Sequence, residues 1–336
     1  MRSDKAPTMA DIARKTGVSP MTVSRAFKSG SLISKDTRDA ILQAAEELGY
    51  VFDSTASNLR SQKTDFIAVT IPSINNANFA DTVRGLSETL SVQGFQILLG
   101  YTNYDTEEEE RLIEQFLRRR PQAIVVTGGK HTPRARKLLE NANVPVVETW
   151  DVPNKPIGHF VGFSNADAVR SMVDHFVATG YARIAFIGGD ASRDTRGSDR
   201  RLGFIAALRD QGLDASRLID AGAPPISMRE GANAMARLLT EYPDTEAVIC
   251  VSDLSAFGAL TECQRRGVAV PERMAIGGFG DYEIGGISVP ALTTIDAQAR
   301  QIGERTGRLI LDLLDDKPDV QHVMIEPQLI VRGSSR

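Results

Sequence analysis

Two arginines, Arg196 and Arg200, are the residues of this sequence whose type and spacing best suit the binding of a small molecule. A helix would place both guanidinium groups on one face, because residues four apart are neighbours on a helix surface. Guanidinium groups favour carboxylate and phosphate, and Lys130 adds a third positive charge, so we expect an anionic ligand. The alternative is that the arginines form surface ion pairs with nearby acidic residues. Those residues are Asp190, Asp194 and Asp199.

The sequence lacks the motifs of the common nucleotide-binding and hydrolytic enzymes. It contains no G-x-S-x-G, no Walker A and no G-x-G-x-x-G sequence. Residues 128–131, Gly-Gly-Lys-His, imitate the end of a phosphate-binding loop but lack its earlier glycine and the Ser or Thr after the lysine. The four histidines show no metal-ligand spacing. We therefore expect neither catalysis nor a metal or other cofactor.

Charge is divided unevenly along the chain. The 336 residues carry a net charge of −4, and 42% are hydrophobic and 24% charged, as in a globular protein. Residues 1–63 contain ten Lys and Arg against seven Asp and Glu, whereas residues 64–336 contain 29 against 36. A basic head on an acidic body predicts that the head contacts nucleic acid.

Targeting and redox signals favour a cytoplasmic location. No run of 18 apolar residues is present, which excludes a transmembrane helix, and no apolar segment follows the N-terminus as in a secretory signal. Two cysteines, Cys250 and Cys263, are too few for a disulfide framework.

Residues 8–50 fit three short helices with the spacing of a helix-turn-helix motif. A capping pair at Thr8 precedes a first helix over 9–16, and Ser19 with Pro20 begins a second over 21–27. A third helix over 35–48 supplies the packing floor. The second helix of such a motif presents its N-terminal residues to base edges in the major groove. The alternative is that the motif serves packing alone.

Two side chains of the second helix suit base recognition. Arg25 can form a bidentate pair with guanine, and Thr22 can reach a base methyl or a phosphate. The following segment, 53–63, is polar with one large apolar residue, Leu59, and by itself predicts a flexible linker.

The body predicts alternating strands and helices. Apolar runs at 66–71, 95–99, 123–126 and 144–147 alternate with amphipathic helices, and a second series starts at Phe160. Such alternation gives parallel, doubly wound sheets whose ligands bind at the carboxyl ends of the strands. The acidic run 107–110 and the basic run 118–120 fit the two ends of one helix, where we expect solvated caps.

The head closely resembles the lactose-repressor (LacI) family in the residues of its helices and turns, which are 9–13, 17–19, 22–25, 34–38 and 48–50. Markers in the body, such as 158–163 and 252–258, extend the resemblance over nearly the whole chain. Segments including 72–76, 131–134 and 274–279 look like the gluconate-operon repressor branch. In this family segment 53–63 is a hinge helix that orders on operator DNA and inserts a leucine at the position of Leu59, although Asp53 departs from the usual Asn.

The resemblance and the motif analysis together name the expected site residues. The DNA contacts are Thr8, Ser19, Pro20, Met21, Thr22, Ser24, Arg25, Lys28, Ala56 and Leu59. The effector contacts are Asn78, Phe79, Thr127, Lys130, Glu148, Asp151, Arg196, Arg200, Ser252, Asp253 and Asp281, the last following Gly280 where many members have Asp.

These features predict an α/β protein with a small all-α helix-turn-helix domain and two doubly wound parallel-sheet subdomains like those of periplasmic binding proteins. The boundaries are 1–52 for the head, 53–63 for the hinge, 64–161 with 293–322 for one lobe, and 162–292 with 323–336 for the other. The expected function is a homodimeric repressor that a sugar acid releases from a palindromic operator. The alternatives are another effector (a neutral sugar, a sugar phosphate or a purine) and a sugar-binding receptor without a DNA role.

Overall fold

The computed structural model describes residues 6–27, 33–52, 64–190, 192–317 and 322–336. The chain divides into two compact units, Met1–Lys63 and Thr64–Arg336. The expected hinge helix, with Asp53, Ala56 and Leu59, lies outside the described residues, as does Lys28. Among the described residues, no helix has the length and apolar character needed to span a membrane.

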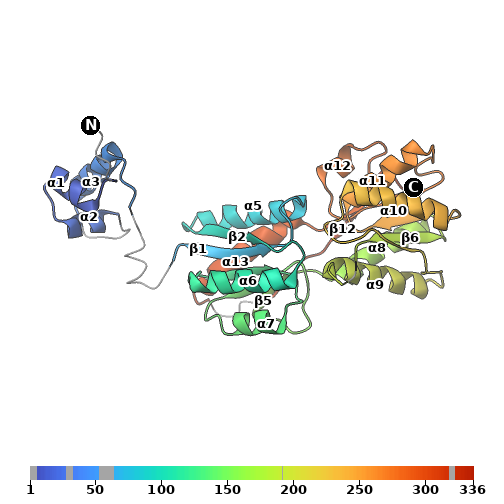
Figure 1. The fold of residues 1–336 in the computed structure, drawn as a ribbon, viewed down its shortest axis with the longest axis horizontal. Coiled ribbons are helices and arrows are strands. Elements are labelled where there is room, and N and C mark those ends of the chain that lie inside the picture. The colour runs from blue at the N-terminus through green and yellow to red at the C-terminus, as the bar shows by residue number, and fades with distance from the viewer. Residues whose placement is uncertain (1–5, 28–32, 53–63, 191, 318–321) are drawn as a thin grey trace. The chain divides into compact units, whose positions relative to one another are not determined.

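The described part of the N-terminal unit contains three helices (Figure 1): α1 (Met9–Thr16), α2 (Pro20–Ala26) and α3 (Lys35–Leu48). They pack around fully buried apolar side chains, among them Ile12, Val23 and Ile41. Gly17 ends α1 with a φ of 70°, a left-handed conformation that favours glycine. The first and third helices are confirmed to the residue. The second begins with Pro20 at its first position, as predicted, and ends at Ala26, one residue before the predicted end.

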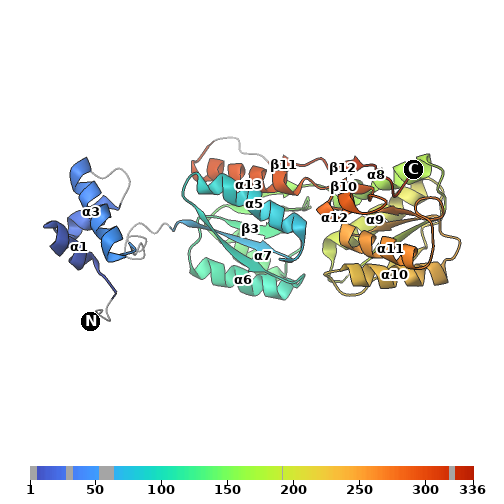
Figure 2. The same ribbon diagram turned by 90° about the horizontal axis from the view of Figure 1, so that it is seen from above.

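A six-stranded parallel sheet forms the first lobe of the larger unit. Its order is β11-β5-β4-β3-β1-β2. The strands are β1 (Phe66–Ile71), β2 (Gln96–Tyr101), β3 (Ile124–Thr127), β4 (Val146–Thr149), β5 (His159–Gly162) and β11 (Val323–Met324). One face is covered by α5 (Ala77–Ser91) and α13 (Ala299–Leu314), the other by α6 (Thr106–Arg118) and α7 (Pro133–Glu140) (Figure 2). Covered faces explain why the central strands are apolar on both sides.

A four-stranded parallel sheet forms the second lobe, in the order β7-β6-β8-β9. Its strands are β6 (Ile184–Gly188), β7 (Leu218–Asp220), β8 (Ala247–Cys250) and β9 (Ala275–Gly277). One face packs against α8 (Asn165–Ala178) and α9 (Thr195–Asp210), and the other against α10 (Met228–Glu241) and α11 (Asp253–Arg265). The short α12 (Glu283–Ile287) follows β9.

The expected start of the second strand series and one expected lobe boundary are wrong. The second series does not start at Phe160, because β5 pairs with β4 in the first sheet. The boundary after residue 322 also misplaces β11, which pairs with β5. An apolar run identifies a buried strand but not the sheet that it joins. A separate antiparallel pair, β10 (Thr294–Asp296) with β12 (Gln328–Ile330), lies where the chain passes between the lobes.

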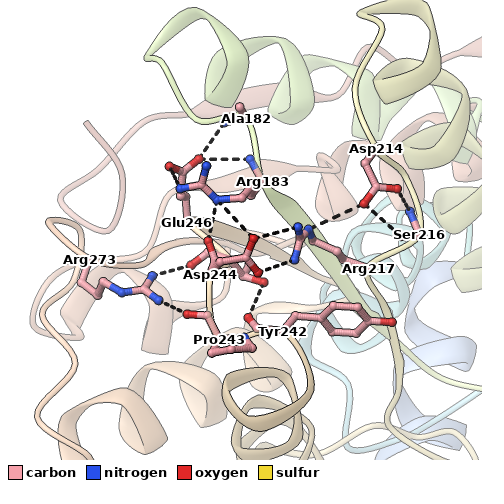
Figure 3. Close-up of polar contacts among 11 residues, drawn as sticks. Ala182, Arg183, Asp214, Ser216, Arg217, Tyr242, Pro243, Asp244, Glu246 and Arg273 are labelled. Carbon is pink, nitrogen blue, oxygen red and sulfur yellow. Dashed lines mark hydrogen bonds and ion pairs between the residues drawn. The ribbon is translucent and has the colours of Figure 1, made fainter.

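Ion pairs and hydrogen bonds connect the loops that precede the strands of the second lobe's sheet (Figure 3). Arg217 donates from two nitrogens to Asp244, at 2.8 and 3.0 Å. Arg183 pairs with Glu246, and Arg273 donates to two backbone carbonyl oxygens of the same loop. These arginines hold the loop before β8. Val251 and the cavity described below lie beyond the other end of β8, so the arginines do not reach the cavity.

Close packing of α5 against α13 depends on Gly303, where an added Cβ would lie 2.0 Å from the carbonyl oxygen of Thr82. We expect Gly303→Ala to lower the free energy of unfolding by about 1–3 kcal/mol, because the helices must move apart. A Cβ at Gly286 meets no atom within 4 Å, so Gly286→Ala is the matched control, with a change below about 1 kcal/mol. Urea unfolding measures both, and equal stabilities would contradict the packing argument.

Candidate functional site

A cavity of about 160 Å³ lies between the two lobes, beyond the carboxyl ends of strands from both sheets. This volume holds on the order of ten water molecules, so a solute the size of a sugar fits. Its polar lining consists of Ser73, Asn75, Asn76, Asn78, Tyr104, Asp194, Arg196, Arg200, Ser227, Ser252 and Tyr282. Its apolar lining consists of Phe79, Trp150, Pro224, Pro225, Ile226, Val251, Leu254 and Phe279.

Helix α9 presents both predicted arginines to this cavity. The helix begins at Thr195, where Asp194 caps it by accepting a hydrogen bond from the Gly197 N–H at 3.0 Å. The cap brings Arg196 and Arg200 into the first two turns, so both guanidinium groups lie on the cavity side.

Arg200 is held by uncharged partners. Its Nε donates to Asn165 Oδ1 at 3.0 Å and its Nη1 donates to the carbonyl oxygen of Val251 at 2.9 Å. The guanidinium group also stacks over the ring of Phe279, 3.6 Å from the centroid. Withdrawal from solvent lowers the pKa of Arg200 to about 10, so the group stays positively charged at neutral pH.

Arg196 has a similar environment. It is buried, its Nη1 donates to the carbonyl oxygen of Thr127 at 3.4 Å, and it lies over the Phe79 ring at 5.6 Å. No carboxylate among the described residues lies within ion-pair distance of either arginine. The ion-pair alternative therefore finds no support here: Asp194 caps α9, and Asp199 pairs with Lys130.

Aromatic rings and hydroxyl groups complete the cavity. Phe79 packs edge to face against Trp150, with 5.3 Å between centroids. The Tyr282 hydroxyl, from the second lobe, donates to Asn76 Oδ1 of the first lobe at 2.6 Å. Burial raises the pKa of Tyr282 and of Tyr104, so both hydroxyls are neutral hydrogen-bond donors. Such a mixture of ring faces and hydroxyls suits a polyhydroxy ligand.

The cavity lining brings together five of the predicted effector contacts, namely Asn78, Phe79, Arg196, Arg200 and Ser252. Asn78 and Phe79 lie in the first turn of α5, which Asn76 caps, and Ser252 caps α11.

The other six predicted contacts lie outside the lining and have protein partners. In the first lobe, Thr127 donates to the Thr70 carbonyl at 2.8 Å, Glu148 accepts from the Ile157 N–H at 2.7 Å, and Asp151 accepts from the Gly129 N–H at 3.3 Å. Lys130 lies outside the lining of this cavity, 2.8 Å from Asp199, with which it lines a separate hollow between the lobes. In the second lobe, Asp253 accepts from the Tyr282 N–H at 2.7 Å, and Asp281 pairs with Arg332 at 2.6 Å.

Sequence analysis missed several lining residues that the fold brings to the cavity. They are Asn76, Tyr104, Trp150, Phe279 and Tyr282. Each lies in a loop, or at the start of a helix, that follows the carboxyl end of a parallel strand. A search of those loops for aromatic and amide side chains would have found them.

The prediction that the whole acidic run 107–110 is a solvated helix cap is wrong. Glu109 is buried, and its Oε2 lies 2.7 Å from Nδ1 of His131. The His131 Nε2 lies 3.4 Å from Oε1 of the fully buried Glu148. Burial of the ring opposes its protonation, but the two carboxylates more than offset this and raise the pKa of His131 to about 9.

The N-terminal unit presents the start of α2 to solvent. Pro20 occupies its first position, Ser19 Oγ accepts from the Thr22 N–H at 3.2 Å, and Met21 is 60% exposed. Arg25 is exposed one turn later, and Ser24 is half-buried. In the cap of α1, the Thr8 hydroxyl donates to the Asp11 carboxylate at 2.7 Å. An exposed arginine behind a capped helix start fits entry into a major groove.

Comparison with known families finds a match for each unit. The model described as "Bacterial regulatory proteins, lacI family" matches residues 8–53. The model described as "Periplasmic binding protein-like domain" matches residues 173–335.

Similar proteins span almost the whole chain. The HTH-type transcriptional regulator GntR of Pseudomonas aeruginosa is 34% identical over 316 residues, which cover 94% of this chain and 92% of the relative. IdnR of Escherichia coli is 31% identical, covering 90% and 91%. A LacI family transcriptional regulator from Silicibacter pomeroyi superposes with a TM-score of 0.77 at 43% identity, covering 81% of this chain and 99% of that one. The transcription regulator GntR from Chromobacterium violaceum gives 0.76 at 34%, covering 80% and 99%.

His131 predicts a pH dependence of stability. Its pKa is about 9 when folded against 6.5 normally, so its stabilisation is fully present below pH 6.5 and is lost as pH rises through 9. We expect the free energy of unfolding, measured in urea from pH 6 to 10, to fall over that range in the wild type. His131→Gln should remove this fall, whereas substitution of the exposed His322 by Gln should keep it. A wild-type stability that rises towards pH 9 would contradict the assignment.

Proposed function

This chain belongs to the lacI family of bacterial regulatory proteins and is a DNA-binding transcriptional regulator, and from that premise we propose that a sugar acid of the gluconate type controls it. The observation that carries the proposal is the pair Arg196 and Arg200, which line the cavity without a carboxylate partner among the described residues. A ligand carboxylate supplies the missing negative charge. The similarity to the regulators named GntR and IdnR agrees with the branch that the sequence resembles.

The proposed mechanism couples the cavity to DNA through the lobes. A homodimer places two α2 helices on the halves of a palindromic operator. An effector that binds between the lobes favours one arrangement of them, and operator release follows when that arrangement separates the two DNA-binding units. An affinity difference of about 100-fold between the two states supplies near 3 kcal/mol for this shift.

We propose no catalytic activity, in keeping with the relatives, which are named as transcriptional regulators. Consumption of D-gluconate during incubation with the purified protein would contradict this part of the proposal.

The effector class is tested by thermal shift and by release of operator DNA. We expect D-gluconate to raise the Tm and to release the operator, and glucose and hypoxanthine to do neither. Arg196→Gln should weaken gluconate binding roughly ten- to hundredfold, because a charge-assisted hydrogen bond is lost. Arg209→Gln, an exposed position on the same helix, is the control and should bind as the wild type does. A response to a neutral sugar, a sugar phosphate or a purine alone would overturn the assignment.

The role of α2 is tested on an operator selected from randomised DNA. Arg25→Ala should weaken binding by about 1–3 kcal/mol, because a bidentate contact to a base is lost. Lys137→Ala removes an exposed charge from the larger unit and should leave the affinity unchanged. Equal operator affinities of the Arg25→Ala variant and the wild type, measured by electrophoretic shift at one salt concentration, would remove Arg25 from the interface.

A further inference from the structure

We infer that loop 128–131 of the first lobe and the start of α9 in the second lobe form a latch that holds the lobes closed over the cavity. This is the Gly-Gly-Lys-His segment that imitates a phosphate-binding loop. The inference deepens the regulation of the proposed effector site and rests on the proposed function only for its last readout.

The residues of the proposed latch form hydrogen bonds from one lobe to the other. Lys130 Nζ donates to both carboxylate oxygens of Asp199, at 2.8 and 3.1 Å. Arg196 donates to the Thr127 carbonyl, directly before the loop, at 3.4 Å. Arg193 of the second lobe donates to the carbonyl oxygen of Asn103, in the loop after β2 of the first lobe, at 3.2 Å. All of the second-lobe residues lie in α9 or immediately before it, so this one helix end makes the contacts described here.

The two glycines let the loop pack closely, Gly128 against α9 of the second lobe and Gly129 against its own lobe. Gly128 has a φ of +99°, a conformation that side chains disfavour, and an added Cβ would lie 2.9 Å from Arg196 Nη1. Gly129 donates its N–H to Asp151 Oδ2 at 3.3 Å, and a Cβ there would lie 2.7 Å from Pro153. Arg196 of the second lobe and Pro153 of the first lobe therefore lie directly against the backbone of this loop.

His131 anchors the loop in its own lobe. Its side chain is only 1% exposed and lies between the carboxylates of Glu109 on α6 and Glu148 on β4. Lys130 is next in sequence to this anchor, yet its side chain is 52% exposed and extends to Asp199 of the second lobe. His131 fixes the loop in the first lobe, while the Lys130 side chain is exposed. The ion pair with Asp199 can therefore form and break as the lobes close and open.

The Lys130–Asp199 ion pair has a strength that would shift the equilibrium between open and closed lobes without fixing it. An ion pair this exposed changes an equilibrium by roughly two- to fivefold and is screened by salt. Lys130 therefore acts as a positioning residue for lobe closure, in place of the effector contact that the sequence predicts.

The test measures the distance between the lobes in the full chain without effector. Cysteines introduced by Lys137→Cys on α7 and Arg209→Cys on α9 carry the spin labels, and the native Cys250 and Cys263 are buried and do not react. We expect Lys130→Ala and Asp199→Ala each to raise the ratio of open to closed molecules roughly two- to fivefold. The combined exchange of Lys130→Asp with Asp199→Lys should restore the wild-type ratio. Lys155→Ala, an exposed lysine of the same lobe with no ion pair among the described residues, is the control.

Each outcome decides the matter. Unchanged distances in both single variants, or an exchange variant as open as the single ones, would overturn the latch. Added salt should open the wild type but not Asp199→Ala, and equal salt responses would also count against it.

Calorimetry with D-gluconate then separates the latch from the effector proposal. If the wild type binds gluconate, the single variants should bind more weakly by the same two- to fivefold factor, and the exchange should restore the affinity. Loss without restoration would mean that Lys130 contacts the ligand directly. If the wild type does not bind gluconate, the proposed effector fails, while the distance measurement still decides the latch.

Discussion

Positive charge withdrawn from solvent is the constraint on which the larger unit depends. A guanidinium group loses much of its hydration in a cavity, and this cost must be offset locally. Here Arg196 and Arg200 are offset by carbonyl oxygens and by the faces of Phe79 and Phe279, not by carboxylates among the described residues. No carboxylate among the described residues lies within ion-pair distance of these arginines, and this is the ground for the proposed anionic ligand.

The fold supplies that environment from both lobes. The carboxyl ends of two parallel sheets face one another, so loops far apart in sequence contribute to one cavity. Tyr282 and Asn76, 206 residues apart, join the lobes by a hydrogen bond beside the arginines. The start of α9 carries the two cavity arginines and also Asp199, which pairs with Lys130 of the first lobe. The proposed effector contacts and the proposed latch thus lie on one helix.

Local order was predictable from the sequence, whereas long-range pairing was not. Apolar runs and caps located α1, α3 and the central strands, and spacing identified the arginine pair. The sheet to which β5 and β11 belong depends on contacts that no local pattern encodes. The burial of Glu109 likewise depends on His131, 22 residues later, so an acidic run that looks solvated hides one structural carboxylate. Tyr104 and Tyr282 could be identified as candidates from their loops after strand ends, but only the fold shows that they line one cavity.

The late position of α13 and β11 in the chain has a consequence for synthesis. The Thr82 hydroxyl of the first lobe donates to the carbonyl of Ala299, 217 residues later, and β11 adds the edge strand beside β5. In the second lobe, the Ser334 hydroxyl donates to the Ile276 carbonyl. Neither lobe is complete until the segment after residue 293 has left the ribosome, whereas the three helices of the N-terminal unit can fold as soon as they emerge. The N-terminal unit, which carries α2, can therefore fold before either lobe of the larger unit is complete.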